Sequence, residues 1–93
     1  MIDSRYIEAF LAVVNTNSLS KAAESLYVSQ SSISKWICQL EEEIGVELIV
    51  RHKGQRSIEL TASGKELVPL AEEWMNLHGQ IIGMKEHNRT SIR

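Results

Sequence analysis

The stretch SLSKAAESLYVSQSSISKWICQLEEEIG, residues 18–45, decides the fold because it places two amphipathic segments in close succession. In the first segment Ala22, Ala23 and Leu26 recur at helical spacing, and the two adjacent alanines let another helix approach closely. In the second segment one narrow helical face is apolar, and it carries Ile33, Ile37, Leu40 and Ile44. Two helices joined by so short a connection are typical of a helix-turn-helix.

Serine and glycine mark the expected ends of these two helices. We expect Ser20 to cap the first helix, because a serine hydroxyl can accept a backbone N–H group of the first turn. Ser29 is expected to begin the second helix, which runs over 29–44. Gly45 follows as the residue that adopts a left-handed conformation without strain.

A further helix precedes this pair. Its apolar residues recur at helical spacing and are Tyr6, Ile7, Phe10, Leu11, Val13 and Val14. Asp3 or Ser4 is placed to cap its start, and the polar residues 15–18 end it. The sequence therefore predicts three helices before residue 45.

A small β-hairpin, or wing, is expected after Gly45. Residues 46–50 are rich in branched side chains, residues 57–60 alternate, and Gly54 between them suits a tight turn. The tip, RHKGQR at 51–56, carries three fixed positive charges and no acid. An acidic block of Glu41, Glu42, Glu43 and Glu47 lies just before it, and we interpret that block as a solvated surface.

The remaining residues predict one long helix that pairs with another helix. Thr61 is expected to cap it, and Pro69 predicts a kink because proline removes a backbone hydrogen bond. An apolar stripe repeats at spacings of four, three, four and three and consists of Leu70, Trp74, Leu77, Ile81 and Met84. One small core cannot cover a helix about 30 Å long, so we expect a second copy of the chain to cover the stripe.

The face of the 29–44 helix opposite its apolar row is unusual for a solvated surface. It holds Ser31, Lys35, Cys38 and Glu42, and Gln30 and Ser34 lie nearby. Short donors and acceptors of this kind suit close approach to a DNA duplex, where glutamine can bond adenine edges and lysine can bond guanine or phosphate. The sequence therefore predicts that the first half of this helix enters the major groove.

Bulk properties exclude several classes of protein. The chain has 93 residues, which suits one small domain, and its net charge of −2 argues mildly against nucleic acid. We expect no membrane span, no secretory signal, and a cytoplasmic protein. Cys38 is the one cysteine and the three histidines are widely spaced, so no metal or other cofactor is expected. No pattern of catalytic residues indicates an enzyme.

The order of these segments resembles the N-terminal domain of LysR-type transcriptional regulators. The resemblance lies in FLAVV at 10–14, SLSKAAESL at 18–26, VSQSSISK at 28–35, LEEEIGVEL at 40–48 and LTASG at 60–64. It implies a bacterial regulator of mainly α fold, with a winged helix-turn-helix over 1–60, an antiparallel dimerisation helix over 61–85 and a flexible tail over 86–93. Family members also carry a larger effector-binding domain, which these residues do not include.

Carried over by position, the resemblance implies contacts with double-stranded DNA. The helix over 29–44 would enter the major groove, and the wing at 51–56 would touch flanking backbone or the minor groove. The implied contacts are Ser20, Lys21, Ser29, Gln30, Ser31, Ser32, Ser34, Lys35, Arg51, Lys53, Gln55 and Arg56. Cys38 stands where the family is often basic, which predicts a salt-dependence slope lower by about one unit.

One alternative interpretation of the function remains, together with an expectation for Trp36. The low net charge, Cys38 and the acidic block also fit a winged-helix module that no longer binds DNA and instead pairs with other chains through its apolar stripe. For Trp36, which lies near the edge of the apolar face, we expect packing against the wing or the last helix rather than stacking on DNA.

Overall fold

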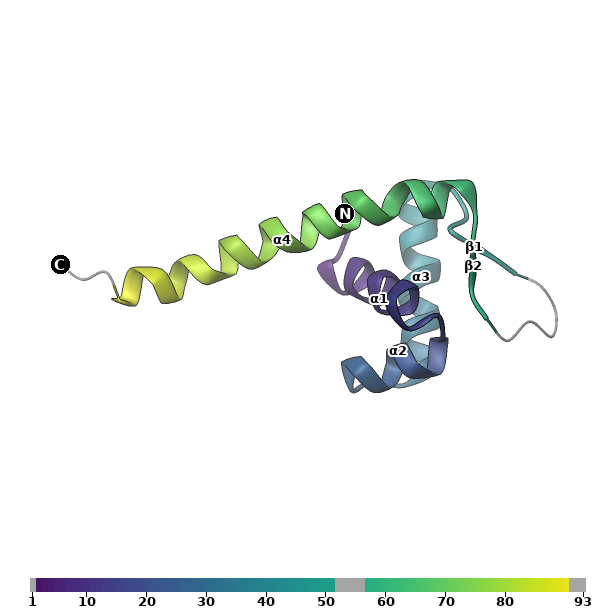
Figure 1. Ribbon diagram of the computed structural model, residues 1–93, viewed down its shortest axis with the longest axis horizontal. Coiled ribbons are helices and arrows are strands. Elements are labelled where there is room, and N and C mark those ends of the chain that lie inside the picture. The colour runs from purple at the N-terminus through teal and green to yellow at the C-terminus, as the bar shows by residue number, and fades with distance from the viewer. Residues whose placement is uncertain (1, 52–56, 91–93) are drawn as a thin grey trace.

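The protein was studied as a computed structural model, which describes the backbone of residues 2–51 and 57–90 and their side chains as far as Met84. In chain order the elements are α1 (Ser4–Thr16), α2 (Leu19–Leu26), α3 (Gln30–Ile44), β1 (Ile49–Val50), β2 (Glu59–Leu60) and α4 (Ala62–Thr90). Figure 1 shows α1, α2 and α3 gathered into one body, with the two strands beside it and α4 extending far beyond it. The predicted mainly α, winged helix-turn-helix architecture is confirmed.

The core lies between α1, α2 and α3 and is closed by the segment that follows α3. Its largest fully buried side chains come from these elements and are Phe10, Val13, Ile33, Ile37, Leu40 and Leu48. Ala22 and Ala23 are buried on α2, which brings that helix close to its neighbours. From α4 only Ala71 is fully part of this core among the described residues. The apolar rows predicted for the first three helices therefore face inward except at Ile44, which is 38% exposed at the last position of α3, where the helix runs out beyond the core.

The first two helices end on left-handed residues. Asp3 caps α1 by accepting the Arg5 backbone N–H at 2.8 Å, as predicted. Asn17 ends α1 at a φ of 57°, and Tyr27 ends α2 at a φ of 58°. A left-handed conformation is easy for asparagine and costly for a bulky residue such as tyrosine. Tyr27 nevertheless satisfies the end of α2, because its backbone N–H donates to the carbonyl oxygens of Ala23 and Glu24.

The predicted cap of α2 was wrong by two residues. Ser18, not Ser20, is the N-cap, and its Oγ accepts the backbone N–H of Lys21 at 3.1 Å. Ser20 lies within the first turn of the helix, and its hydroxyl lies 3.4 Å from that of Ser18. Both serines suit a cap chemically. The extended backbone of Ser18 decides between them, since only a residue outside the helix can aim its oxygen at the third N–H group.

The ends of α3 agree with the sequence. Ser29 is the N-cap, and Gly45 ends the helix at a φ of 87° with its N–H donated to the Glu41 carbonyl oxygen at 2.7 Å. α3 therefore has helical geometry over Gln30–Ile44, one residue shorter than the predicted range 29–44, which included the cap.

The strands of the wing are shorter than the sequence pattern suggests. β1 and β2 pair antiparallel, with Ile49 opposite Leu60 and Val50 opposite Glu59. Residues 46–48 lie outside the strands: the Leu48 N–H donates to the Glu41 carboxylate at 2.8 Å. Thr61 donates its hydroxyl to the Glu47 carbonyl oxygen at 2.6 Å and its N–H to that of Leu48 at 3.0 Å. The tip of the wing, residues 52–56, lies outside the described residues, and so do the predicted contacts Lys53, Gln55 and Arg56.

Close packing at Gly64 joins α4 to the rest of the domain. Thr61 caps α4 as predicted, with its Oγ1 accepting the Gly64 N–H at 2.9 Å. Gly64 is buried, and a Cβ atom there would collide with the carbonyl oxygen of Leu48. Only glycine allows the two backbones to lie so close.

The last helix is longer than predicted. α4 continues through Pro69, so the proline does not end it, although it cannot donate a hydrogen bond to the Lys65 carbonyl oxygen. The helix also runs past the expected boundary at 85 as far as Thr90, where a flexible tail over 86–93 was expected. No helix in the described part of the chain has the length and apolar character to cross a membrane.

Candidate nucleic-acid interface

The outer face of α3 lies open to solvent. Ser31, Lys35 and Cys38 are exposed on it, directly opposite the buried Ile33 and Ile37. Gln30 is exposed at the start of the helix, and Ser34 is half-buried beside the wing. We call these five residues, Gln30, Ser31, Ser34, Lys35 and Cys38, the α3 strip; within the described chain all of them except Ser34 are exposed. Its side chains are short or flexible and, apart from Cys38, polar.

Hydroxyl groups cluster where α3 begins. Ser29 Oγ accepts the Ser32 backbone N–H at 3.1 Å and lies 3.1 and 2.9 Å from the hydroxyls of Ser31 and Ser32. These bonds fix the serine side chains close to the first turn. The helix end also has a partial positive charge, because its first backbone N–H groups have no partner within the helix. Anionic oxygens are favoured at such a position.

Two more predicted residues lie at the start of α2. Ser20 and Lys21 are both exposed. Leu19, the residue before them, lines the same crevice as Ser34 of α3, so the start of α2 lies near the α3 strip. Lys21 and Lys35 are therefore the cations that the two helices of this motif supply.

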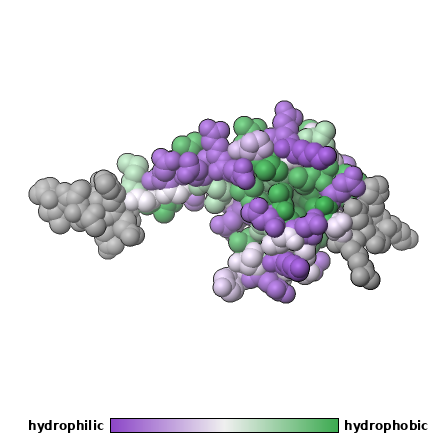
Figure 2. Space-filling model, in the orientation of Figure 1, coloured by the Kyte–Doolittle hydropathy of each residue, from purple (hydrophilic) through white to green (hydrophobic). Residues whose placement is uncertain are grey.

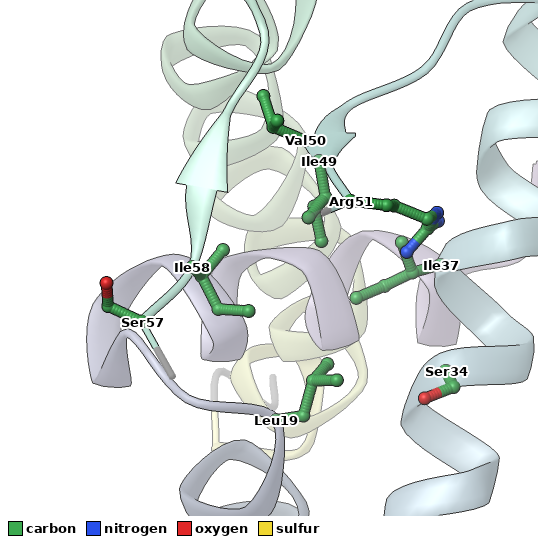
Figure 3. Close-up of a pocket in the computed structure, with 8 residues that line it drawn as sticks. All are labelled: Leu19, Ser34, Ile37, Ile49, Val50, Arg51, Ser57 and Ile58. Atoms are coloured by element: carbon green, nitrogen blue, oxygen red, sulfur yellow. The ribbon is translucent and has the colours of Figure 1, made fainter. Parts of the chain in front are cut away.

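A crevice of about 200 Å³ separates α3 from the wing (Figure 3). Its lining combines apolar and polar side chains from α2, α3 and the strand pair: Leu19, Ser34, Ile37, Ile49, Val50, Arg51, Ser57 and Ile58. One side is held in place by Asn17, whose Oδ1 accepts the Ile58 backbone N–H at 3.0 Å. The wing is thus tied to the end of α1 as well as to α4.

Arg51 does not stand free at the wing, although it was predicted as a DNA contact. Its Nη2 donates to Glu41 Oε1 at 2.6 Å, and it also lies 3.9 Å from the Cys38 Sγ. Figure 3 shows the side chain reaching from the end of β1 toward α3. The guanidinium group therefore lies at the C-terminal end of the α3 strip, beside Cys38.

Glu41 is a structural residue that the sequence reading missed. Its other oxygen, Oε2, accepts the backbone N–H groups of Leu48 at 2.8 Å and Ile49 at 3.4 Å. The side chain is only 12% exposed, so interpreting the whole acidic block as solvated surface was wrong for Glu41. The single available signal was a glutamate on the helix ten residues before an arginine, which is too common a pattern to predict an ion pair.

Trp36 lies half-buried against the core, as its position at the edge of the apolar face predicted. The guanidinium carbon of Arg5 on α1 lies 5.7 Å from the centre of the tryptophan ring, within the range of a cation–π contact. Arg5 also pairs with Asp3 at 2.8 Å, and its hydrogen bonds lower the pKa of Asp3 to about 2. Trp36 thus contacts α1, an element the sequence reading did not predict as its neighbour.

The predicted apolar stripe on α4 is exposed in the single chain. The exposed fractions are 59% for Leu70, 39% for Trp74, 51% for Leu77, 65% for Ile81 and 58% for Met84. Figure 2 shows green, hydrophobic atoms at intervals along α4 between purple, hydrophilic ones. Trp74, Leu77 and Ile81 also line a shallow pocket of about 190 Å³ together with His78. We call these five residues the α4 stripe.

A second apolar row on α4 faces the domain. Val68 and Met75 pack against the core, and Ala71 belongs to it. Ile82 continues this row beyond the domain, and it is 64% exposed. The α4 stripe lies on another side of the helix, so the domain cannot cover it. Within 2–51 and 57–90, no group of His, Cys, Asp and Glu residues is arranged to hold a metal ion.

Comparison with known proteins agrees with this geometry. Residues 4–65 match the family model described as "Bacterial regulatory helix-turn-helix protein, lysR family". The HTH-type transcriptional regulator HdfR of Escherichia coli is 39% identical over 95 residues, which cover 98% of this chain and 33% of that protein. This chain thus spans about a third of the length of the curated relatives it matches.

Solved structures give the same result. The BenM_DBD/catB site 1 DNA complex has a TM-score of 0.86 at 30% identity and covers 98% of this chain and 99% of that one. The CbnR_DBD–DNA complex has a TM-score of 0.81 at 32% identity, with 91% and 95% covered. Vibrio fischeri DarR in complex with DNA has a TM-score of 0.83 at 31% identity, with 94% and 29% covered. From its sequence and its winged fold alike, this chain belongs to the lysR family of bacterial regulatory helix-turn-helix proteins.

Proposed function

We propose that this chain is the DNA-binding part of a bacterial transcription regulator and binds specific sequences of double-stranded DNA with α3 in the major groove. The observation that carries the proposal is the open α3 strip, whose small polar side chains leave room for a base edge. Support comes from the similarity of the whole fold to domains that were solved with DNA. We further propose that it works in the cytoplasm, without catalysis, together with a larger effector-binding domain.

Within the α3 strip, different side chains suit different parts of the duplex. Gln30 is exposed at the first helical position and can donate to and accept from an adenine edge. Lys35, five residues further along the helix, suits a guanine edge or a phosphate. Ser29, Ser31, Ser32 and Ser34 suit either base or phosphate oxygens. Gln30 is therefore the residue on which sequence preference depends most.

A second group of residues is proposed to bind the sugar–phosphate backbone. Ser20 and Lys21 lie exposed at the start of α2, beside the α3 strip. From the wing, we propose Arg51, Lys53, Gln55 and Arg56 on the family resemblance. Such contacts add affinity for every sequence and make binding salt-dependent, because each paired cation releases counterions from DNA.

The α4 stripe is proposed to pair antiparallel with the same stripe of a second copy. Leu77 lies midway between Leu70 and Met84, so an antiparallel pair has its two-fold axis near Leu77. Such a dimer presents two α3 helices to one face of the duplex, with half-sites one or more turns apart, about 34 Å per turn.

The test of DNA reading begins with selection of bound duplexes from a random pool. Binding of the selected site is then measured by fluorescence anisotropy at fixed salt, for the parent and for Gln30→Ala. We expect the substitution to weaken binding to the selected site by about 1–3 kcal/mol, because a bidentate base contact is lost. Gln80→Ala, an exposed glutamine of α4, is the matched control and should bind as the parent does. Parent-like binding by Gln30→Ala contradicts the assignment.

The test of the dimer uses disulfide formation in a Cys38→Ser background. Leu77→Cys should cross-link to itself near the two-fold axis. Leu70→Cys mixed with Met84→Cys should cross-link across the pair, while neither should cross-link alone. Efficient cross-links of Leu70→Cys to itself would show parallel pairing and overturn the antiparallel arrangement.

The second candidate function is a protein-interaction module that does not bind DNA. The net charge of −2 and the exposed α4 stripe favour it. A titration against genomic DNA fragments at low and moderate salt separates the two, since a DNA-binding domain loses affinity steeply as salt rises. An interaction module would show no binding at either salt concentration.

A further inference from the structure

The Glu41–Arg51 ion pair lies on the side of the domain that we propose faces DNA. Arg51 Nη2 lies 3.9 Å from the Sγ of Cys38, and Cys38 lies on the α3 strip. The Arg51 side chain is 52% exposed, so a phosphate could reach it. Yet its Nη2 already donates to the Glu41 carboxylate at 2.6 Å, so the positive charge is locally balanced.

The surroundings of the pair are acidic. Beside α3 lies an open depression lined by Cys38, Glu41, Glu42, Gly45, Val46, Glu47 and Arg51. Among these described residues three are carboxylates and one is a cation. A phosphate approaching Arg51 therefore meets a region whose charges sum to an excess of negative charge, which disfavours its binding.

Glu41 cannot easily move away from Arg51. Its Oε2 is held by the backbone N–H groups of Leu48 and Ile49, and the side chain is mostly covered. Hydrogen bonds from two backbone donors to one carboxylate oxygen fix its position. Arg51 is thus held by an anion that the fold keeps in place.

We propose that Glu41 is a positioning residue that holds Arg51 against α3 and so limits the sequence-independent affinity for DNA. The inference rests on the proposed DNA binding and refines it, because it moves Arg51 from a free backbone contact to a restrained one. Removing the carboxylate, while keeping the size of the side chain, frees one cation beside the α3 strip. A restraint of this kind favours release from unrelated sequences.

The experiment measures the slope of log K against log salt concentration for an unrelated duplex. Glu41→Gln should tighten binding and steepen the slope by about 0.9, the value for one additional phosphate neutralised on B-form DNA. Glu42→Gln is the matched control, because it removes the same charge from the same depression without touching Arg51. We expect Glu42→Gln to leave the slope close to that of the parent.

A second pair of variants tests whether the effect passes through Arg51. In an Arg51→Gln background, Glu41→Gln should no longer steepen the slope, since no cation is released. If Glu41→Gln steepens it equally in that background, or steepens it no more than Glu42→Gln does, the restraint is overturned. Thermal melts establish that each variant is folded at the assay temperature.

If Glu41→Gln does not fold, a third comparison of variants tests the restraint on Arg51. Arg51→Gln is compared with Lys35→Gln, the exposed cation of the same strip. The restraint predicts that Arg51→Gln flattens the slope clearly less than Lys35→Gln does, and equal flattening overturns it. If the parent chain binds no DNA at all, the proposed function is contradicted. If the parent binds DNA but Arg51→Gln and Lys35→Gln flatten the slope equally, only the restraint is contradicted.

Discussion

Two helix faces of this molecule are uncovered, and they differ in chemistry. The α3 strip is built from two serines, a glutamine, a lysine and a cysteine, and it belongs to a helix whose other side buries Ile33, Ile37 and Leu40. The α4 stripe is built from large apolar side chains, each at least 39% exposed. Exposure of the polar α3 strip to water costs little free energy. Burial of the apolar α4 stripe would stabilise an assembly by roughly 25 cal/mol for each Å² covered.

The difference indicates two kinds of partner. Short polar groups around a helix start suit a polyanion with hydrogen-bonding edges, and an apolar stripe repeating every three or four residues suits another helix. The two faces also lie on parts of the chain that Gly64 and Thr61 hold together closely. Association through one face therefore fixes where the other is presented.

The largest expected effect comes from placing a charge in the α4 stripe. Leu77→Lys should weaken the dimer by about 3–6 kcal/mol, because burial of a leucine contributes about 1.5–3 kcal/mol and the two-fold axis doubles the loss. Sedimentation analysis over a range of concentrations measures the change. Asn76→Lys adds the same charge at an exposed position about 100° away from Leu77 around α4, outside the α4 stripe, and should leave the dimer intact. If both variants weaken the dimer equally, the α4 stripe is not the surface through which the two copies pair.

The next effect concerns the junction between the two regions. Gly64→Ala should destabilise the fold by about 1–3 kcal/mol, because its methyl group collides with the Leu48 carbonyl oxygen. Gly79→Ala meets no atom within 4 Å and should instead stabilise α4 by about 1 kcal/mol. Urea unfolding at one fixed protein concentration gives both values. Opposite signs are the prediction, and a neutral Gly64→Ala would contradict the close packing.

A smaller effect separates the two serines at the start of α2. Ser18→Ala should cost about 1 kcal/mol of stability, since the cap to Lys21 is lost. Ser20→Ala should leave stability nearly unchanged and weaken DNA binding slightly for all sequences. Unfolding curves and anisotropy titrations on the same two proteins check this, and a larger stability loss from Ser20→Ala would mean that the cap is assigned to the wrong residue.

The smallest effect is expected at the turn between α2 and α3. Tyr27 is 95% exposed and left-handed, so Tyr27→Asn should stabilise the fold by about 0.5 kcal/mol through relief of backbone strain. Its affinity for the selected DNA should not change, because Tyr27 is outside the proposed contact set. A thermal melt and one titration suffice. A loss of affinity would add Tyr27 to the surface that binds DNA.

Local chemistry explains which parts of the fold could be predicted from the sequence. Ser29 and Gly45 mark the ends of α3 because the cap and the left-handed turn depend on residues within a few positions. The same reasoning failed at α2, where Ser18 and Ser20 are equally good caps and the path of the backbone decides. The sequence pattern also predicted strands that are too long. The carbonyl groups of Glu47 and Leu48 bind Thr61, which lies more than ten residues away, so local residues did not reveal these bonds.

In the candidate site, too, some features could be predicted from the sequence and others could not. Exposure of Gln30, Ser31 and Lys35 follows from helical periodicity, because the buried row fixes the opposite face. The bond from Ile58 to Asn17 spans 41 positions, and the Arg51 pair joins a helix to a strand. No periodicity connects such residues, and only the folded structure brings them together.

The central claim is that the α3 strip faces DNA, and cysteine protection tests it most directly. In a Cys38→Ser background, Ser31→Cys is alkylated with and without the selected duplex, and Glu73→Cys on the exposed surface of α4 serves as the control. The account predicts that saturating DNA slows alkylation at position 31 severalfold and leaves position 73 unchanged. Equal alkylation rates at position 31 with and without bound DNA would contradict it.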